Sequence, residues 1–533
     1  MEKQKERFGV LIGCAESAVM KIDRIKVLMD ELAKIGYNLL ELNIDDIYKI
    51  EGEPYFGYLR GGYTKAEIRE MDEYAKSKGV ELVPAIQTLA HLTNLVKIPH
   101  YADIIDIDNI LLVDEPKTYE LIDKMFASIA DCFSSRKVNI GFDEAHNIGL
   151  GKYLDKHGYT DRYELLIRHL EKVVEIAGKY GFKIHMWSDM FFKLANRGEY
   201  WKKGVKIPQR VCQKVPEEVE LCYWDYYGTD EEMYGEMIRS HKQFDRELWF
   251  AGGAWTWNGF APHNRFSLES MLPAIKQVRK HGIQNVLITM WGDDGHDCSY
   301  FSVLPALYAI KQYAEGNFDE EKIKQGFFEL FQLDFDDFML LDLPNKNKSN
   351  PEMKKTDNAC KVLLYNDCFL GLKDVAFEPL APVPFGEYAD ELEKVGARMG
   401  EYSYLYDNLA ALCRVLDTKA ELGLRTRKAY KDRDKAALKG LIANYEETVR
   451  RIGIFRNTLR NAWMKDNKPY GWDIQEMRLG GLKARLTDCV QRLQEYLDGT
   501  VKNIPELEEE LLPYATWGSQ YNVYCGFVTV SQL

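Results

Sequence analysis

The stretch 137–158, KVNIGFDEAHNIGLGKYLDKHG, predicts a short buried strand over 138–142 that ends in two adjacent acids, Asp143 and Glu144. Two neighbouring carboxylates beside an apolar strand are costly to bury, because each raises the energy of ionising the other. Acids at this position either cap the following helix or carry out chemistry. The stretch alone leaves both interpretations open.

Seven further β-rich runs lie along the first 317 residues, and amphipathic helical patterns alternate with them. The predicted strands cover 8–14, 38–45, 81–87, 138–144, 183–189, 219–227, 248–256 and 285–293, and the main helices cover 19–35, 64–78, 116–133, 161–180, 230–244, 267–281 and 301–313. Eight strand–helix units in about 310 residues predict an α/β fold, the (β/α)8 TIM barrel, over residues 1–317. A doubly wound open sheet is the alternative, but no Gly-rich nucleotide-binding motif follows any of these strands.

Nearly every predicted strand ends in polar or aromatic side chains. A parallel barrel gathers the C-terminal ends of its strands on one face, where barrel enzymes build their active sites. The candidates at these ends are Glu16, Asp45, Asp46, Gln87, His91, Asp143, Glu144, Trp187, Asp189, Tyr223, Trp224, Asp225, Trp255, Trp257, Trp291 and Asp293. So many ends of this kind are hard to explain as helix caps, and the sequence therefore favours catalysis for the two adjacent acids.

Composition narrows the class of protein. The 533 residues are 46% hydrophobic and 29% charged, a balance that supports a sizeable globular core. A net charge of −13 without a basic tract argues against nucleic acid and against an anionic membrane surface as partners. The N-terminus lacks a signal-peptide pattern, and the ten cysteines are scattered without metal-ligand spacing. We therefore expect a cytoplasmic protein with reduced thiols, no metal and no cofactor.

Aromatic residues point to a class of ligand. The chain has 32 tyrosines and 10 tryptophans, and several of them stand next to acids. Aromatic rings stack on the apolar faces of pyranoses, while carboxylates accept hydrogen bonds from sugar hydroxyls. The combination is typical of a sugar-binding cleft.

The β pattern stops near residue 317. A helix and a polar linker are predicted over 318–355, followed by a helical C-terminal domain over 356–533. Helical periodicity runs through 387–430, 434–465 and 473–497, as expected for an antiparallel bundle, and the tail 521–533 reads as an extended strand. A long helical domain is also compatible with a homodimer.

The adjacency of Asp143 and Glu144 bears on mechanism. Glycosidases usually place two carboxylates on opposite sides of the scissile bond, roughly 5 to 9 Å apart. Neighbours on a strand point in opposite directions and would form an awkward pair at one anomeric carbon. A better division of labour makes Glu144 the general acid and lets Asp143 orient a nucleophile supplied by the substrate itself.

These strand ends resemble the motifs of glycoside hydrolase family 20, the β-N-acetylhexosaminidases, and most of all its intracellular bacterial GcnA-like branch. NIGFDE at 139–144 is similar to the family's His-x-Gly-Gly-Asp-Glu, with the first histidine and the second glycine replaced. PAIQTLAH at 84–91 resembles PEIDMPGH, although Gln87 stands where the family has an acid. The remaining matches are Trp187 with Asp189, Tyr223 with Asp225, and Trp291 with Asp293. The resemblance covers the barrel well and, further on, rests mainly on 467–485.

The resemblance implies an exo-acting, retaining hydrolase that releases terminal β-linked GlcNAc or GalNAc from oligosaccharides or glycoconjugates through an oxazoline. It implies that Glu144 acts as acid and then base, that Asp143 binds the acetamido N–H, and that Tyr223 binds the acetamido oxygen. Together with the other strand-end candidates, the predicted substrate-binding residues are Glu16, His91, Trp187, Asp189, Trp224, Asp225, Trp255, Trp257, Trp291 and Asp293.

The chain also departs from the family. Better-known branches clamp the sugar O3 and O4 with an arginine after the first strand, where this chain has Glu16. Either Arg60 replaces that arginine or Glu16 accepts the hydroxyls directly. Two other functions remain as alternatives: another acetamido-assisted glycosidase, such as an O-GlcNAcase-like hydrolase with Asp-Asp on its fourth strand, and a sugar-binding barrel without catalysis.

Overall fold

The computed structural model describes residues 6–514, 523–529 and 531. Eight parallel strands close into a barrel in the order β1-β10-β9-β8-β7-β6-β3-β2. These strands are β1 (Arg7–Gly13), β2 (Leu39–Asn43), β3 (Glu81–Ala85), β6 (Lys137–Asn139), β7 (Lys183–Trp187), β8 (Glu220–Trp224), β9 (Leu248–Gly253) and β10 (Asn285–Met290). The predicted (β/α)8 TIM barrel is confirmed, and its strands are mainly apolar, as suits strands covered on both faces.

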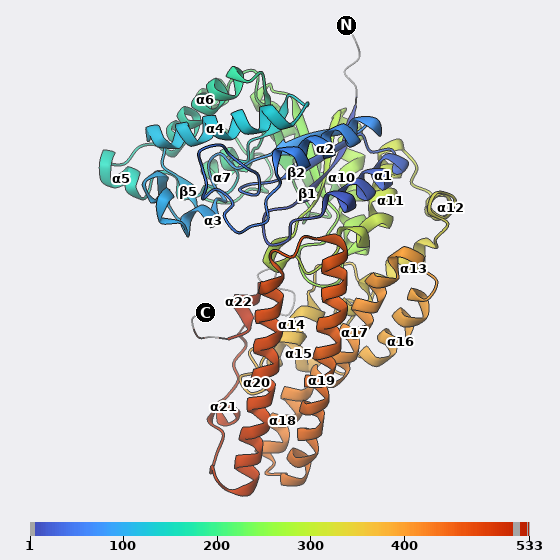
Figure 1. Cartoon of the computed structure of the whole chain (residues 1–533). Helices are drawn as coiled ribbons and strands as arrows, with labels where there is room; N and C mark the ends of the chain where they lie inside the picture. Colours follow the sequence, from blue (N-terminus) through green and yellow to red (C-terminus); the bar gives the residue numbers. More distant parts are fainter. Residues whose placement is uncertain (1–5, 515–522, 530, 532–533) are drawn as a thin grey trace.

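Helices surround the barrel (Figure 1). The main ones are α1 (Ile22–Ile35), α2 (Lys65–Ser77), α4 (Pro116–Cys132), α6 (Arg162–Lys179), α7 (Asp189–Ala195), α9 (Glu231–His241), α10 (Asn264–His281) and α11 (Leu304–Glu315). Local sequence sets their ends: Thr64 and Glu67 form a capping box before α2, and Gly36 ends α1 with φ at 102°.

The loop after β3 holds structure that the sequence analysis did not predict. It contains α3 (Thr93–Val96), a 3-10 helix η1 (Pro99–Ile104) and a small antiparallel hairpin of β4 (Ile105–Ile107) and β5 (Ile110–Leu111). Two further short helices, α5 (Lys152–His157) and α8 (Gln209–Cys212), lie in later loops. These pieces were missed because they are too short to show a hydrophobic period.

The strand predicted over 138–144 is shorter than expected, since β6 ends at Asn139. Gly141, Phe142 and Glu144 all have positive φ, at 73°, 78° and 53°, which bends the chain out of the sheet. No helix begins at the two acids, because the next one, α5, has its N-cap at Gly151. The helix-capping interpretation of Asp143 and Glu144 is therefore wrong.

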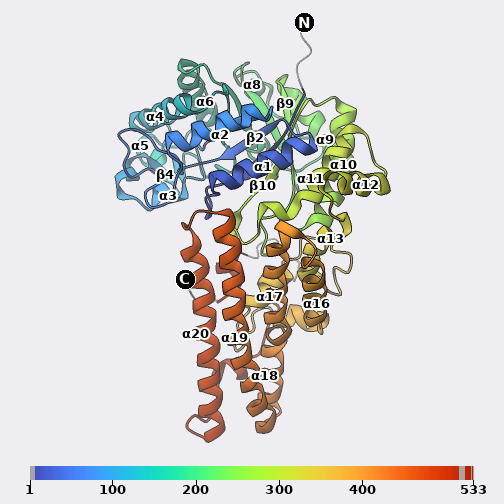
Figure 2. The same ribbon diagram turned by 45° about the vertical axis from the view of Figure 1, so that its right-hand side comes forward.

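The rest of the chain is helical and extends from one side of the barrel (Figures 1 and 2). Its helices are α12 (Glu320–Phe331), α13 (Phe335–Met339), α14 (Ala359–Tyr365), α15 (Asp374–Phe377), α16 (Phe385–Gly396), α17 (Ser403–Lys419), α18 (Leu422–Lys431), α19 (Lys435–Asp466), α20 (Trp472–Asp498), α21 (Pro505–Glu508) and α22 (Tyr524–Phe527). The long helices α19 and α20 lie side by side in both views. Their Leu and aromatic positions are buried at helical spacing, as expected for a bundle core.

Two details differ from expectation in this part. The extended tail predicted over 521–533 is wrong where the structure describes it, because Tyr524–Phe527 is a helical turn; residues 521, 522, 530, 532 and 533 lie outside the described residues. The predicted linker is packed, with Asn345, Asn347 and Asn350 buried. The exact domain boundaries stay a prediction.

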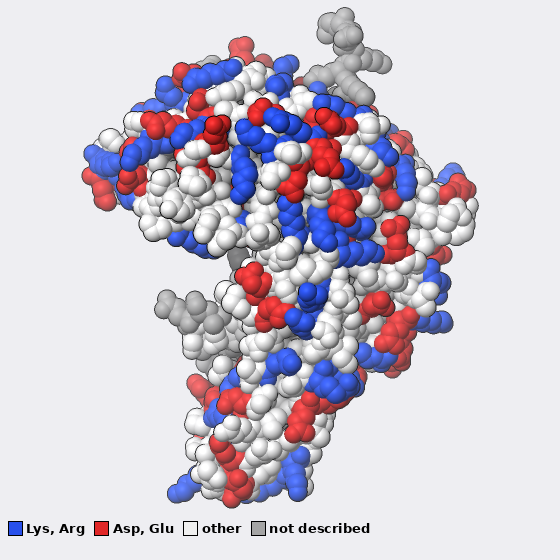
Figure 3. Space-filling model, viewed as in Figure 1, with Lys and Arg blue, Asp and Glu red and all other residues white. Residues whose placement is uncertain are grey.

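Charged side chains of both signs are interspersed over the barrel and the helical extension on the face shown in Figure 3. Among the described residues, no helix combines the length and apolarity needed to cross a bilayer. The ten cysteines are free thiols, and nine of them are buried.

Candidate active site

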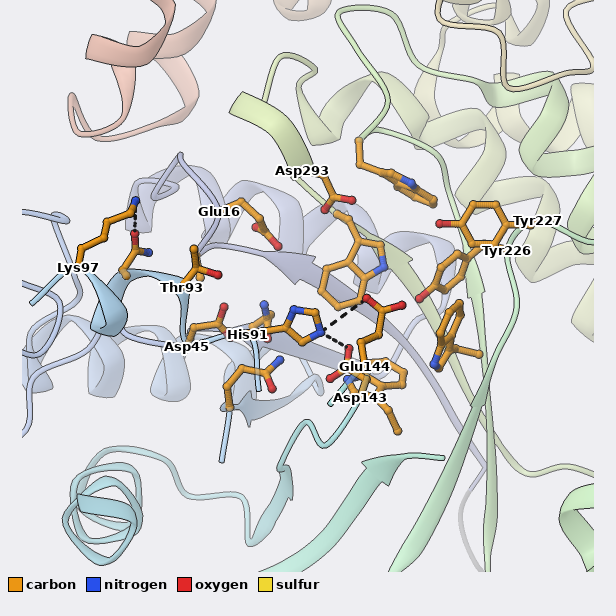
Figure 4. A pocket seen from close by; sticks show the side chains of 18 residues that line it. Glu16, Asp45, His91, Thr93, Lys97, Asp143, Glu144, Tyr226, Tyr227 and Asp293 are labelled. Carbon is orange, nitrogen blue, oxygen red and sulfur yellow. Dashed lines mark hydrogen bonds and ion pairs between the residues drawn. The ribbon is translucent and has the colours of Figure 1, made fainter. Parts of the chain in front are cut away.

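A cavity of about 410 Å³ opens at the C-terminal ends of the barrel strands (Figure 4). It is lined by residues from the ends of all eight strands or the loops that follow them. Nine of the thirteen predicted site residues line it: Glu16, His91, Asp143, Glu144, Trp187, Trp224, Trp257, Trp291 and Asp293. Its size lies within the range of small-ligand pockets, roughly 300 to 1,000 Å³.

The bend after β6 brings both adjacent acids into this cavity. The N–H of Gly141 donates to the side chain of Asn139, which holds the start of the bend. The left-handed φ values of Phe142 and Glu144 then point both carboxylates to the same side, as Figure 4 shows. Backbone in this conformation is strained for ordinary residues and is found most often at functional sites.

Asp143 forms an ion pair with His91. The imidazole Nε2 lies 3.1 Å from Asp143 Oδ2 and 3.9 Å from Glu144 Oε2. The charge of Asp143 raises the pKa of His91 from 6.5 to about 10, although burial opposes the shift. Burial alone would raise the pKa of Asp143, but the charge and hydrogen bond of His91 outweigh it and hold that pKa below its usual value. Asp143 is therefore ionised and His91 is a cation at neutral pH.

This pair makes stability depend on pH. His91 has a raised pKa, so its contribution is complete below pH 6.5 and is lost as pH rises through about 10. Asp143 has a lowered pKa, so its contribution is present above about 3.8 and is lost as pH falls below that value. We expect His91→Gln to lower the free energy of unfolding most between pH 4 and 6.5, and progressively less toward pH 10. Urea unfolding of both proteins across this range tests it, and a difference that does not change with pH would contradict it.

Glu144 is held from behind by two residues of α7. Its backbone N–H donates to Asp189 Oδ2 at 3.1 Å, and Lys193 Nζ lies 3.0 Å from its carboxylate and 3.1 Å from Asp189. Asp189 is fully buried, and burial raises its pKa to about 6. The prediction that Asp189 contacts substrate is therefore wrong. It lies at the first turn of α7, where it supports the backbone and the lysine that position Glu144.

Tyr223 and Asp225 are also outside the cavity, contrary to prediction. Tyr223 is completely buried between the sheet and α9, where its ring packs against His241. Its hydroxyl donates to Asp225 at 3.0 Å, and Asp225 also accepts the backbone N–H groups of Tyr227 and Gly228. Side chains alternate across a strand, and on β8 it is Trp224 that faces the cavity. Tyr223 and Asp225 instead brace the turn after β8.

Tyr226 and Tyr227 take the place in the cavity that was expected for Tyr223. The Tyr226 ring stacks on the Trp224 ring with a centroid separation of 5.3 Å, and it contacts the Trp257 ring edge-on with a centroid separation of 5.5 Å. Burial raises the pKa of Tyr226 well above its usual value, so its hydroxyl stays protonated and is available as a donor. Because Tyr226 lies two residues after Trp224, the period of the strand was the signal that could have identified it.

Tryptophans form the walls of the site. The rings of Trp187 and Trp291 are in contact, with their centroids 6.1 Å apart and their planes at 56°. Trp255 is stacked behind Trp257, with their ring centroids 4.2 Å apart, and it does not line this cavity. It supports Trp257 and lines a second cavity instead.

One end of the cavity is acidic, with Glu16, Asp45 and Asp293 facing it (Figure 4). Burial raises the pKa of all three, and with the charge of Glu16 it brings the pKa of Asp293 to about 8. Buried oxygens of Glu16, Asp45 and Asp143 have no hydrogen-bond partner among the described residues. Unpaired buried acceptors are unfavourable, so these atoms suit the hydroxyl and N–H donors of a ligand.

Arg60 does not replace the missing arginine. Its guanidinium donates to the backbone carbonyls of Ala15 and Glu16 and to Asp46, so it holds the loop after β1 from outside the cavity. No arginine lines the cavity within the described chain. Asn94 and Lys97 at the rim, and Gln87 and Asn43 deeper in, are further polar contacts that the prediction did not include.

A second cavity of about 270 Å³ adjoins the first and shares Glu144, Trp224, Tyr227, Trp257 and Asp293 with it. Its remaining lining includes Trp201, Trp255 and Asn258 from the barrel, and Val523 from the C-terminal segment. Within the described residues, no group of His, Cys, Asp and Glu side chains has the arrangement of a metal site. The two cavities meet at Glu144.

The chain is similar in sequence to known glycoside hydrolases. The family model "Glycosyl hydrolase family 20, catalytic domain" matches residues 18–232, and "Glycoside Hydrolase 20C C-terminal domain" matches residues 336–524. Hexosaminidase D of Bos taurus is 22% identical over 300 residues, which cover 52% of this chain and 80% of that protein. A beta-hexosaminidase of Vibrio furnissii is 26% identical over 217 residues, or 32% of this chain, and the chain spans only 35% of that protein. A solved family 20 exo beta-N-acetylglucosaminidase of Vibrio harveyi, in complex with N-acetylglucosamine, superposes with a TM-score of 0.46 at 18% identity, covering 62% of this chain and 58% of that one.

Proposed function

The chain belongs to glycoside hydrolase family 20, and from this premise we propose that it is an exo-acting, retaining β-N-acetylhexosaminidase. Its substrates would be oligosaccharides or glycoconjugates with a terminal β-linked GlcNAc or GalNAc. The observation that carries the proposal is the convergence of Asp143 and Glu144 in one aromatic-walled cavity, with Asp143 kept ionised by His91. The cytoplasmic location and the homodimer stay predictions of the sequence.

In the proposed mechanism, Glu144 donates a proton to the glycosidic oxygen as the bond to the anomeric carbon breaks. The acetamido oxygen attacks that carbon from the other face, while Asp143 accepts a hydrogen bond from the acetamido N–H and stabilises the positive charge that develops there. An oxazolinium ion results. Glu144 then removes a proton from a water molecule, whose oxygen opens the ring and restores the β configuration.

Asp143 suits this role better than that of a nucleophile. Its Oδ2 is occupied by the His91 cation at 3.1 Å, while Oδ1 has no partner among the described residues. An ion-paired carboxylate accepts hydrogen bonds well, and one free oxygen matches the single N–H of an acetamido group. We place the acetamido methyl against the tryptophan pair that walls this part of the site, Trp187 and Trp291.

The remaining substrate groups follow from the same placement. The acidic end of the cavity would receive the ring hydroxyls, with Glu16, Asp45 and Asp293 as hydrogen-bond partners. The leaving group must lie near Glu144, and we therefore place the aglycone in the second cavity, against Trp201 and Trp257. Sugar rings stack on exposed indole faces, which suits an aglycone that is itself a sugar.

The alternative functions have less support. An O-GlcNAcase-like hydrolase would belong to another family and would carry Asp-Asp in place of Asp143 and Glu144. A non-catalytic barrel does not explain why a strained bend brings an intact pair of acids together in the cavity.

Turnover of 4-nitrophenyl β-GlcNAc and β-GalNAc, with the α-anomers as controls, tests the proposal directly. We expect hydrolysis of both β-substrates and not of the α-anomers. Proton NMR of the reaction should show the β-hemiacetal as the first product. An intact chain that hydrolyses neither β-substrate would overturn the proposal, and release of the α-hemiacetal would overturn retention.

We place the acetamido oxygen at the hydroxyl of Tyr226, which lines the cavity, and Tyr226 and Tyr223 form a matched pair that tests this placement. We expect Tyr226→Phe to lower kcat/KM roughly 10- to 150-fold. A hydrogen bond to a charged group contributes about 1.5 to 3 kcal/mol, and its loss corresponds to this range. Tyr223→Phe removes the same atom outside the cavity and should change stability more than activity. Steady-state kinetics and thermal unfolding of both variants separate these effects. A larger loss of activity for Tyr223→Phe would return the role to the residue predicted from sequence.

A further inference from the structure

The loop after β10 connects the active site with the helical part of the chain. Trp291 and Asp293 of this loop line the first cavity, and Asp294 and Asp297 face the C-terminal helices. Asp294 and His296 have positive φ, at 50° and 55°. Non-glycine residues keep this conformation only where their surroundings hold it in place.

The C-terminal helices bind every oxygen of Asp294. Arg478 of α20 donates to its Oδ1 at 2.7 Å and to its backbone carbonyl at 2.6 Å. Lys361 of α14 lies 2.9 Å from its Oδ2 and 3.0 Å from the same carbonyl. The backbone N–H of Tyr524, at the start of α22, donates to Oδ2 at 2.6 Å. Three helices from distant parts of the sequence therefore meet at one residue of the loop.

The following residues of the loop are held in the same way. Gln475 of α20 donates to the carbonyl of Gly295 at 2.9 Å and to Asp297 at 2.6 Å. Lys361 also pairs with Asp297 at 2.6 Å. The side chain of Lys361 is 1% exposed, and that of Arg478 is 12% exposed. Removing one partner from such a buried cluster leaves the opposite charge uncompensated, so the loop conformation depends on these contacts.

We propose that Lys361 and Arg478 are positioning residues of the active site, through which the C-terminal helices hold Asp293 and Trp291 against the bound sugar. Asp293 is the neighbour of the clamped residue, and its carboxylate faces the cavity (Figure 4). The same loop makes no other ion pair among the described residues that would hold Asp294 in its left-handed conformation. This inference rests on the proposed function, because it assigns Asp293 to the sugar hydroxyls.

Arg478 and Arg485 provide a matched test on one helix. Arg485 lies two turns further along α20 and donates to Asp367 at 2.7 and 3.2 Å, within the C-terminal helices. We expect Arg478→Met to lower kcat/KM for aryl β-HexNAc roughly 10- to 100-fold, mainly through KM, because a displaced binding group weakens substrate orientation. Arg485→Met should stay within about twofold of the intact chain. Arg478→Lys keeps the buried charge but cannot contact both Oδ1 and the backbone carbonyl of Asp294 in the same way. Its kcat/KM should lie between those of Arg478→Met and Arg485→Met, and it should fold normally.

A double-mutant cycle with Asp293→Ala shows whether Arg478 acts through Asp293. If it does, Arg478→Met should have little further effect on kcat/KM in the Asp293→Ala background. If the two losses multiply, Arg478 does not act through Asp293 and the inference is overturned. It is also overturned if Arg478→Met and Arg478→Lys both behave like Arg485→Met. An intact chain without turnover would overturn the proposed function instead, so the two failures are distinguishable.

Discussion

Asp143→Asn is expected to lower kcat/KM on β-GlcNAc substrates by roughly 100- to 1,000-fold, the cost of losing one group that stabilises developing charge in a transition state. Asparagine has the shape of aspartate but no negative charge. It can no longer balance the positive charge that develops on the acetamido group. It also leaves the His91 cation without its partner at 3.1 Å.

The loss should be similar for substrates with good and with poor leaving groups. Attack by the acetamido oxygen is required in both cases, and Asp143 assists that attack rather than departure of the leaving group. A 4-nitrophenyl β-glucoside, which has no acetamido group, is the matched control. Its slow hydrolysis should change little in Asp143→Asn.

Affinity for an oxazoline-mimicking thiazoline gives a second measurement. An inhibitor of this kind should bind Asp143→Asn more weakly by a factor similar to the loss in kcat/KM, because both report stabilisation of the same charge. If Asp143→Asn kept near-full activity on β-GlcNAc, substrate assistance would be wrong. Only the role of Glu144 as general acid would then remain of the proposed mechanism.

Much of the site could be predicted because a parallel barrel brings all its strand ends to one face. Glu16, His91, Trp187, Trp291 and Asp293 lie far apart in the sequence, and all line the same cavity. The alternation of strands and helices was enough to predict that arrangement. The prediction that these residues meet on one face did not require knowing what any single one of them does.

The failures have a common physical cause, which is the direction of a side chain at the end of its strand or just after it. Tyr223 and Asp225 belong to the same run as Tyr226, yet the pleat of β8 and the turn after it place only Tyr226 in the cavity. Asp189 follows Trp187 by two residues, but a helix begins there and turns the carboxylate under Glu144. The period of β8 could have separated Tyr223 from Tyr226, whereas the helix start at Asp189 depends on packing that periodicity does not reveal.

Contacts between the barrel and the helices were beyond prediction for another reason. Asp294 and Arg478 are 184 residues apart, one in the loop after β10 and the other in helix α20. Nothing in the sequence pattern around either residue points to the other. Only the closed structure shows that they meet beside the active site.

Glu144→Gln should lower activity in proportion to the need of the leaving group for a proton. For a disaccharide, whose leaving alkoxide is strongly basic, we expect a fall in kcat/KM on the order of 1,000-fold, within the range of general acid catalysis. For 2,4-dinitrophenyl β-GlcNAc, whose leaving group departs without protonation, the fall in kcat/KM should be about tenfold or less. Glutamine can still accept the hydrogen bond from Lys193 that holds Glu144, so the cavity should keep its shape.

The second step of the reaction provides the sharper measurement. Glu144 also has to deprotonate the water that opens the oxazoline, so the variant should accumulate this intermediate with the activated substrate and show a burst followed by slow turnover. Azide needs no deprotonation and should restore turnover, giving the β-glycosyl azide. Asp143→Asn, in which formation of the oxazoline itself is impaired, should not be rescued in this way. The side chain of Glu144 is 44% exposed at the junction of the two cavities, so either the aglycone or water can reach its carboxylate there. A uniform loss over all leaving groups without azide rescue would therefore show that Glu144 does not use this position as the acid and base.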